Sequence, residues 1–245
     1  RGRESLKYET VLTKWKDLAA GLASPNAQTD TALVSFIGDI RGMIAHSGDT
    51  SNLILDPDLD SYYLMDVTLL ALPQTMDRLA GITAQTYPRL AAGRVMAPQE
   101  IIETAVAASM LGESDIARVA ADMDTSFKED PNFYGKSETY QTDMPPLLAD
   151  YMDKNKALQA ILQDAGGGKV VSQQEFLTAV NAAHDSAYAF WMKGFDELDS
   201  MLKTRIAFYQ AQQYETLLYS GAGIVISMIF FMIVAQSLSG PLGQL

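Results

Sequence analysis

The chain has 245 residues, a formal net charge of −12 and no cysteine. Without cysteine it can form neither a disulfide framework nor a thiolate metal site. Its acidic balance argues against binding to nucleic acid, which needs a basic surface, and against broad adhesion to anionic lipid. The lack of thiols suits an oxidising compartment such as the bacterial periplasm.

Helix-forming residues dominate the chain, and apolar residues recur at spacings of three and four without an alternating strand pattern. We therefore predict an all-α fold. Segments rich in proline, glycine, serine or asparagine divide it into six helices, at about residues 1–23, 30–47, 56–92, 98–130, 137–164 and from 172 onward. Pro73 and Pro88 are expected to kink the third helix.

Several of these helices have a recognisable start. Asp56 can cap the third helix, and Pro57 suits its first turn because a helix leaves the first N–H groups unpaired. Pro98 opens the fourth helix in the same way. Ser172 and Glu175 have the spacing of a capping box at the start of the sixth helix.

The C-terminal part of the sixth helix has the composition of a membrane span. Glu215 is the last charged residue, and the apolar segment 217–238 follows it. About 20 residues at roughly 1.5 Å each match a hydrocarbon core of about 30 Å. We therefore predict a polar domain at residues 1–215, a transmembrane helix at 216–238 and a short following segment at 239–245. A buried core helix and a simple tail anchor are the alternatives.

The order of helix lengths suggests how they pack. Two shorter helices precede a long one, and the same pattern then repeats. Two long helices, each paired with two shorter ones, can form two four-helix bundles stacked end to end. The first and fourth helices would belong to the bundle near the membrane, and the second and fifth to the distal bundle. A single elongated up-down bundle is the alternative.

Motifs of catalysis are missing. His46 and His184 lie far apart, and the chain has no Glu-x-x-His pair, no His-Glu-x-x-His and no Gly-x-Ser-x-Gly. The glycines at 166–168 precede Lys169 without the spacing of a phosphate-binding loop, so they are interpreted as a connector. We expect no catalytic residue, no metal site and no cofactor.

The segment 52–66 has the most unusual composition of the chain. The aspartates at 56, 58 and 60 crowd one helix start, where they complement the exposed N–H groups and the helix dipole. Tyr62 and Asp66 are four residues apart and so share a helix face. An aromatic ring beside a carboxylate can hold a cation or a small polar molecule. The alternative is a bundle core in which the tyrosine hydroxyls reach the rim.

The run at 55–66 (LDPDLDSYYLMD) resembles one found in the extracytoplasmic sensor domains of bacterial chemoreceptors and sensor histidine kinases. The six-helix layout is similar to that of the helical bimodular sensor family, whose members stack two four-helix bundles. Residues 239–245 (SGPLGQL) resemble the start of a HAMP linker, although the basic residue often seen before the proline is absent. A first membrane span is expected upstream of residue 1.

This resemblance implies a homodimeric transmembrane receptor of the methyl-accepting chemotaxis type, in the bacterial inner membrane with its sensor domain in the periplasm. A ligand would shift the membrane-crossing helices, and HAMP would pass the change on. The alternatives are the sensor domain of a membrane histidine kinase, a sensor of a periplasmic partner protein with no small-molecule pocket, and a membrane-bound enzyme with an undetected site.

We expect the ligand pocket between the second, third, fifth and sixth helices. Arg41 could clamp a carboxylate through its planar fork, and Asp66 could hold an ammonium group. Together they would suit an amino acid or another zwitterion, whereas Arg41 alone would suit an organic acid and Asp66 alone an amine. The candidate ligand-binding residues are Arg41, Asn52, Tyr62, Tyr63, Asp66, Tyr140 and Trp191.

Overall fold

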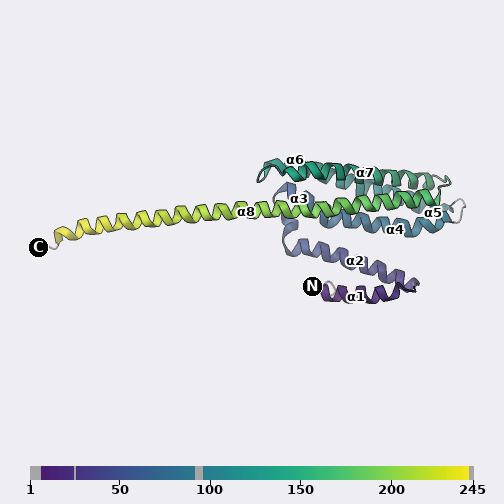
Figure 1. Cartoon of the computed structure of the whole chain (residues 1–245), viewed down its shortest axis with the longest axis horizontal. Coiled ribbons are helices and arrows are strands. Elements are labelled where there is room, and N and C mark those ends of the chain that lie inside the picture. The colour runs from purple at the N-terminus through teal and green to yellow at the C-terminus, as the bar shows by residue number, and fades with distance from the viewer. Residues whose placement is uncertain (1–6, 25, 92–95, 243–245) are drawn as a thin grey trace. The chain divides into compact units, whose positions relative to one another are not determined.

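A computed structural model describes residues 7–24, 26–91 and 96–242 of the chain (Figure 1). Within these ranges every regular element is a helix, which confirms the predicted all-α class. The chain divides into two units, Arg1–Asp199 and Ser200–Leu245. Of the segment predicted to begin a HAMP linker, residues 243–245 lie outside the described residues.

The described helices agree with the six predicted segments when each short π turn is counted as part of the helices on either side of it. The α-helices are α1 Tyr8–Gly21, α2 Ala27–Thr50, α3 Leu59–Met65, α4 Leu72–Ala91, α5 Pro98–Met110, α6 Ala117–Glu129, α7 Glu138–Gly166 and α8 Gln173–Leu242. The π turn η3 (Asp66–Ala71) joins α3 to α4, and the π turn η4 (Leu111–Ile116) joins α5 to α6. The 3₁₀ turns η2 (Leu53–Leu55) and η5 (Asp130–Asn132) lie in the connections.

One helix boundary differs from the predicted one, and a π turn precedes one of the predicted kinks. The side chain of Asn26 accepts hydrogen bonds from the N–H groups of Gln28 and Thr29, so α2 begins at Ala27 rather than near residue 30. Pro73 is the second residue of α4, one residue after the end of η3. Proline has no N–H to donate and clashes with the preceding turn of a regular α-helix, and the wider π turn accommodates it.

Four helical segments form one bundle within the first unit. Helix α5 packs against α7, α3 packs against α6, and α4 contacts η4. The first part of α8 runs beside them in Figure 1 and contacts η3 and α7 through its side chains. The largest side chains in the core are Leu64, Leu72, Leu79, Leu111, Met123, Tyr140, Met144, Tyr151, Phe176 and Phe190, all fully buried.

Helices α1 and α2 form an antiparallel pair beside this bundle (Figure 1). Helix α1 packs mainly on α2, and α2 contacts η2, η3 and α4. Among the described side chains of α2, only Thr29 and Gly48 are buried, and its isoleucines are half-buried. The first helix therefore pairs with the second and not with the fourth, and the predicted arrangement of two stacked bundles is not confirmed.

The C-terminal part of α8 is apolar and fully exposed within the chain. Its most apolar 18-residue window has a mean hydropathy of 2.3, and none of that window is buried. Every large hydrophobic side chain between residues 217 and 234 is at least 38% exposed. Of the helices that the structure describes, α8 is the one that is long and apolar enough to cross a membrane.

Candidate functional site

A groove of about 330 Å³ lies between α2, α4 and the first part of α8. Its volume falls at the small end of the range for small-molecule sites. Arg41 of α2, Asp77 of α4, and His184 and Trp191 of α8 contribute its polar groups. The rest of the lining is apolar and consists of Phe36, Ile37, Ile40, Ile44, Pro73, Met76 and Ala80.

The two charged residues of the groove pair with each other. The guanidinium of Arg41 donates to the carboxylate of Asp77 and so links α2 to α4. The two side chains are 36% and 35% exposed. An ion pair as accessible to water as this one contributes only about 0–1 kcal/mol to stability, because solvent screens it. The Arg41–Asp77 pair can therefore open at little cost.

The indole of Trp191 is held in place by the π turn η3. Its Nε1–H donates a 2.7 Å hydrogen bond to the carbonyl oxygen of Thr68. A π turn breaks the regular pairing of helix carbonyls, which is how such a group becomes accessible to a side chain from another helix. The ring also packs edge-on against Phe195, at 5.3 Å between centroids. Trp191 is thus a rigid, half-buried wall of the groove.

A second groove, of about 310 Å³, lies between α2, η3 and the start of α4. Arg41 and Pro73 line both grooves, and Gly38 and Gly42 of α2 line the second. Helix α2 is therefore flanked by open space along much of its contact with α4 and η3. Its attachment to the bundle depends mainly on half-buried isoleucines, because the exposed Arg41–Asp77 pair adds little.

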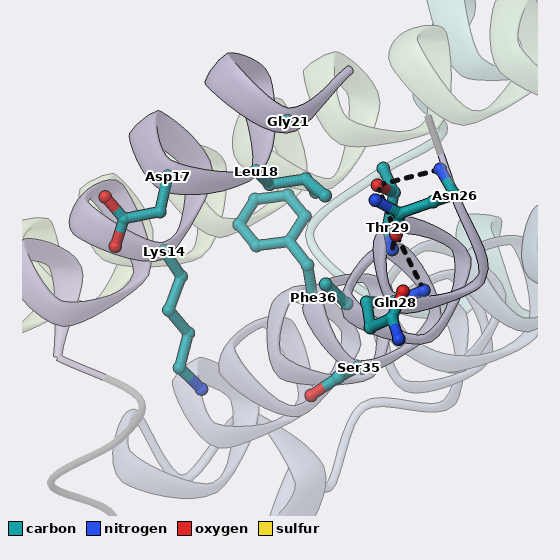
Figure 2. A pocket seen from close by; sticks show the side chains of 10 residues that line it. Lys14, Asp17, Leu18, Gly21, Asn26, Gln28, Thr29, Ser35 and Phe36 are labelled. Atoms are coloured by element: carbon teal, nitrogen blue, oxygen red, sulfur yellow. Dashed lines mark hydrogen bonds between the residues drawn. The ribbon is translucent and has the colours of Figure 1, made fainter. Parts of the chain in front are cut away.

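A third hollow, of about 460 Å³, lies between α1 and α2. Figure 2 shows Leu18 and Phe36 meeting inside it, with Asn26, Gln28 and Thr29 at one end. Those polar residues already form the capping box of α2, in which Asn26 and Thr29 bind each other's backbone N–H groups. Since the polar groups at this end serve to start a helix and Lys14 pairs with Asp39, we do not assign this hollow to a ligand.

A charged cluster links the third and fourth helical segments away from the groove. Arg118 binds Asp66 in a bidentate manner, with Nε 3.0 Å from Oδ2 and Nη2 2.7 Å from Oδ1. Asp122 lies one turn after Arg118, and its Oδ2 is 3.8 Å from the Arg118 Nε. Burial and the neighbouring carboxylate of Asp66 raise the pKa of Asp122 to about 7.

A second ion pair in the bundle involves the π turn η4. Asp115 of η4 is 1% exposed and lies 2.5 Å from Nε of Arg78 in α4. Burial raises the pKa of the Asp115 carboxyl, although the charge of Arg78 opposes the shift. Each of the two π turns therefore contributes an aspartate to an ion pair with the opposite segment.

The structure divides the seven candidate residues among different environments. Arg41 and Trp191 line the same groove. Tyr62 and Tyr63 contact each other edge-on in α3, at 5.3 Å between ring centroids. Asn52 is exposed, in the left-handed conformation with φ of 59°.

Two of these candidates have structural partners that account for them. Tyr140 is fully buried beside the hydroxyl of Ser126 and the ring of Phe127. Asp66 binds Arg118, and neither of the grooves lined by Arg41 includes it. The structure therefore does not bring Arg41 and Asp66 together as a clamp for one zwitterion.

Asp77 is the groove residue that the sequence analysis missed. The chain has 30 aspartates and glutamates, so no spacing rule could select the partner of Arg41 from so many. Among the described residues, no group of three histidines and carboxylates could hold a metal ion.

Comparison with known proteins yields no relative. No family model, no curated protein and no solved structure matches the chain.

Proposed function

We propose that this chain is the ligand-sensing part of a bacterial transmembrane signalling receptor of the chemotaxis type, with its helical domain in the periplasm. The observation that carries the proposal is the double role of α8. The helix supplies Trp191 and His184 to the groove, and farther along it contains the apolar stretch suited to a membrane. A ligand in the groove would touch the same helix that enters the membrane.

The proposed mechanism is a population shift. A ligand changes the balance between two arrangements only if it binds one of them more tightly. Helix α2 is weakly packed and supplies one wall of the groove, so the two arrangements would differ in the position of α2. An altered contact between α2, α4 and α8 would be passed along α8 as a small slide or rotation. The output is a chemotaxis signal, with a histidine kinase as the alternative.

The proposed receptor is a homodimer. Helix α2 leaves its apolar side chains half-exposed, and Val34 in the same helix is 71% exposed. The α1–α2 pair of a second copy would cover these side chains and complete a further four-helix bundle, which would restore the two-bundle arrangement in the dimer. Because the natural chain has no cysteine, a single Val34→Cys variant reports proximity without background. Disulfide-linked dimers in membranes would support the proposal, and monomers alone would oppose it.

Ligand binding is tested with the whole chain reconstituted in lipid nanodiscs. The chain has two tryptophans, so Trp15→Phe leaves Trp191 in the groove as the single tryptophan, whose fluorescence can be excited selectively. We would titrate amino acids, organic acids, amines and purines and measure fluorescence and the unfolding temperature. Ligand at 100 times its Kd adds about 2.7 kcal/mol, and each kcal/mol raises Tm by roughly 2–4 °C in a domain of this size. Silence across the panel would favour a sensor of a protein partner.

A further inference from the structure

We propose that the groove between α2, α4 and α8 binds a free amino acid with an apolar side chain. The inference depends on the proposed sensor function and names the ligand class of that site. Its basis is the pairing of Arg41 with Asp77 on the wall of an otherwise apolar groove. The sequence led us to expect Asp66 beside Arg41, and in the structure Asp77 takes that place.

The charges of the groove select a ligand that carries both signs. Of the described lining residues, Arg41 and Asp77 alone carry a full charge when histidine is neutral. A carboxylic acid that took Arg41 would leave Asp77 without its partner beneath a bound molecule that excludes water. An amine that took Asp77 would leave Arg41 in the same position. Unpaired charges that lose their water are strongly unfavourable, so a one-signed ligand is penalised.

A zwitterion leaves neither group unpaired. Its carboxylate can take both donors of the Arg41 fork, and its ammonium group can bind the Asp77 carboxylate. The two side chains are already side by side, as the charged groups of an amino acid are. Because their mutual pair is partly open to water, exchanging it for two pairs with the ligand requires little reorganisation.

The remaining lining selects the side chain of the ligand. Ile40 and Ile44 of α2 face the groove with Met76 of α4, and the Trp191 ring is fixed by its bond to Thr68. A branched aliphatic or aromatic side chain would bury apolar surface against these residues. A volume of about 330 Å³ suits a single amino acid. Polar amino acids would lack this contribution and bind more weakly.

The test uses the whole Trp15→Phe chain in nanodiscs and four probes. L-Leucine carries both charges and an apolar side chain, N-acetyl-L-leucine lacks the cation, L-leucinamide lacks the anion, and L-serine lacks the apolar side chain. We expect saturable changes in Trp191 fluorescence and a raised Tm with L-leucine. The other three probes should bind at least tenfold more weakly.

Substitutions then test whether L-leucine binds in the groove or elsewhere on the domain. Arg41→Met and Asp77→Asn should each weaken L-leucine binding at least tenfold, and Arg41→Lys should weaken it less because it keeps the charge. The matched control is Lys14→Met with Asp39→Asn, which removes another ion pair of α2 outside this groove and should leave affinity within twofold. Circular dichroism checks that each variant keeps its helices.

The possible failures are distinguishable. Equal binding of N-acetyl-L-leucine or L-leucinamide would overturn the two-charge argument. If L-leucine has no effect but another compound of the wider panel shifts Trp191 fluorescence, the ligand class is wrong and the sensor proposal stands. If no compound has an effect, both direct sensing and this inference fail.

Discussion

Gly194 permits the close approach of α8 to the π turn that holds Trp191. A Cβ atom at this position would lie 2.7 Å from Cγ2 of Thr68, which is closer than real contacts allow. The Thr68 side chain cannot easily rotate away, because its hydroxyl donates to the carbonyl of Leu64 at 2.8 Å. The glycine is therefore required by packing at the wall of the groove.

We predict that Gly194→Ala lowers the free energy of unfolding, by about 1–3 kcal/mol as overpacking usually does. The matched control is Gly81→Ala in α4, where a Cβ atom would meet nothing within 4 Å. There alanine should stabilise the helix by roughly 0.5–1 kcal/mol. Denaturant unfolding followed by circular dichroism measures both. Equal effects of the two substitutions would contradict the assigned contact.

Asp122 makes the stability of the bundle depend on pH. Its pKa is raised to about 7 in the folded chain by burial and by Asp66, whereas an unfolded aspartate titrates near 4. Between pH 4 and pH 7 the carboxyl of Asp122 is therefore protonated in the folded chain and ionised in the unfolded chain. Stability therefore falls as pH rises from about 4 to 7, and the full cost of ionising Asp122 is present above that range.

We predict that Asp122→Asn flattens this part of the pH profile and raises Tm at pH 8 relative to the natural chain. The control is Asp124→Asn, because Asp124 pairs with Lys128 and both side chains are mostly exposed. That variant should leave the slope unchanged. Thermal unfolding between pH 4 and 8 provides the comparison. An unchanged slope in Asp122→Asn would place the titrating group elsewhere, for example at Asp115, whose pKa is also raised by burial.

At the scale of elements, the sequence predicts helices well and their contacts poorly. Pro98 and the glycines at 166–168 mark boundaries near those observed, because breakers act locally. The π turns were not predicted, since a π turn has no distinct apolar spacing. The Asp66–Arg118 pair joins residues 52 apart, and a single sequence gives no means of choosing among the many possible charge partners.

The same distinction between local and long-range information applies to the candidate site. Arg41 and Trp191 were predicted from their chemistry and from helix register, and they do line one groove. Tyr140 was chosen for the same reasons but is fully buried in the core. Aromatic residues suit both a pocket and a core, and tertiary packing alone decides between them.

Helices α2 and α7 differ in how firmly they are packed. Seven side chains of α7 are buried, including Tyr140, Tyr151 and Leu158. In α2 the apolar residues are half-buried or exposed. Local opening is easier where few apolar contacts hold a helix. The pair α1–α2 should therefore open without unfolding of the bundle.

We predict that backbone amides in the middle of α2 exchange with deuterium much faster than those in the middle of α7. Hydrogen exchange read by mass spectrometry on the chain in nanodiscs measures this. The bound amino acid proposed above should slow exchange in α2 and leave α7 unchanged. With a single copy of the chain in each nanodisc, equal protection of the two helices without ligand would contradict the weak packing of α2.

At the scale of the whole molecule, the decisive property is the apolar C-terminal part of α8, which is long enough to cross a membrane. Its apolar part has a mean hydropathy of 2.3 and is not covered by any described part of the chain. Polar backbone groups in hydrocarbon must be paired internally, and a helix satisfies this requirement. The described part of the chain therefore joins a helical domain to a helix that could cross a membrane.

We predict that arginine in the middle of this stretch prevents stable insertion. An arginine at the centre of a spanning helix costs about 2.5–3.5 kcal/mol on insertion-based scales. Membrane insertion of the double variant Ile226→Arg with Phe230→Arg should therefore be strongly impaired. Gln212→Arg adds a charge to the same helix before the apolar stretch begins, and it should remain membrane-bound. The fraction of chain that resists extraction at alkaline pH measures insertion. Full retention of the double variant would mean that α8 is held by protein contacts rather than by lipid.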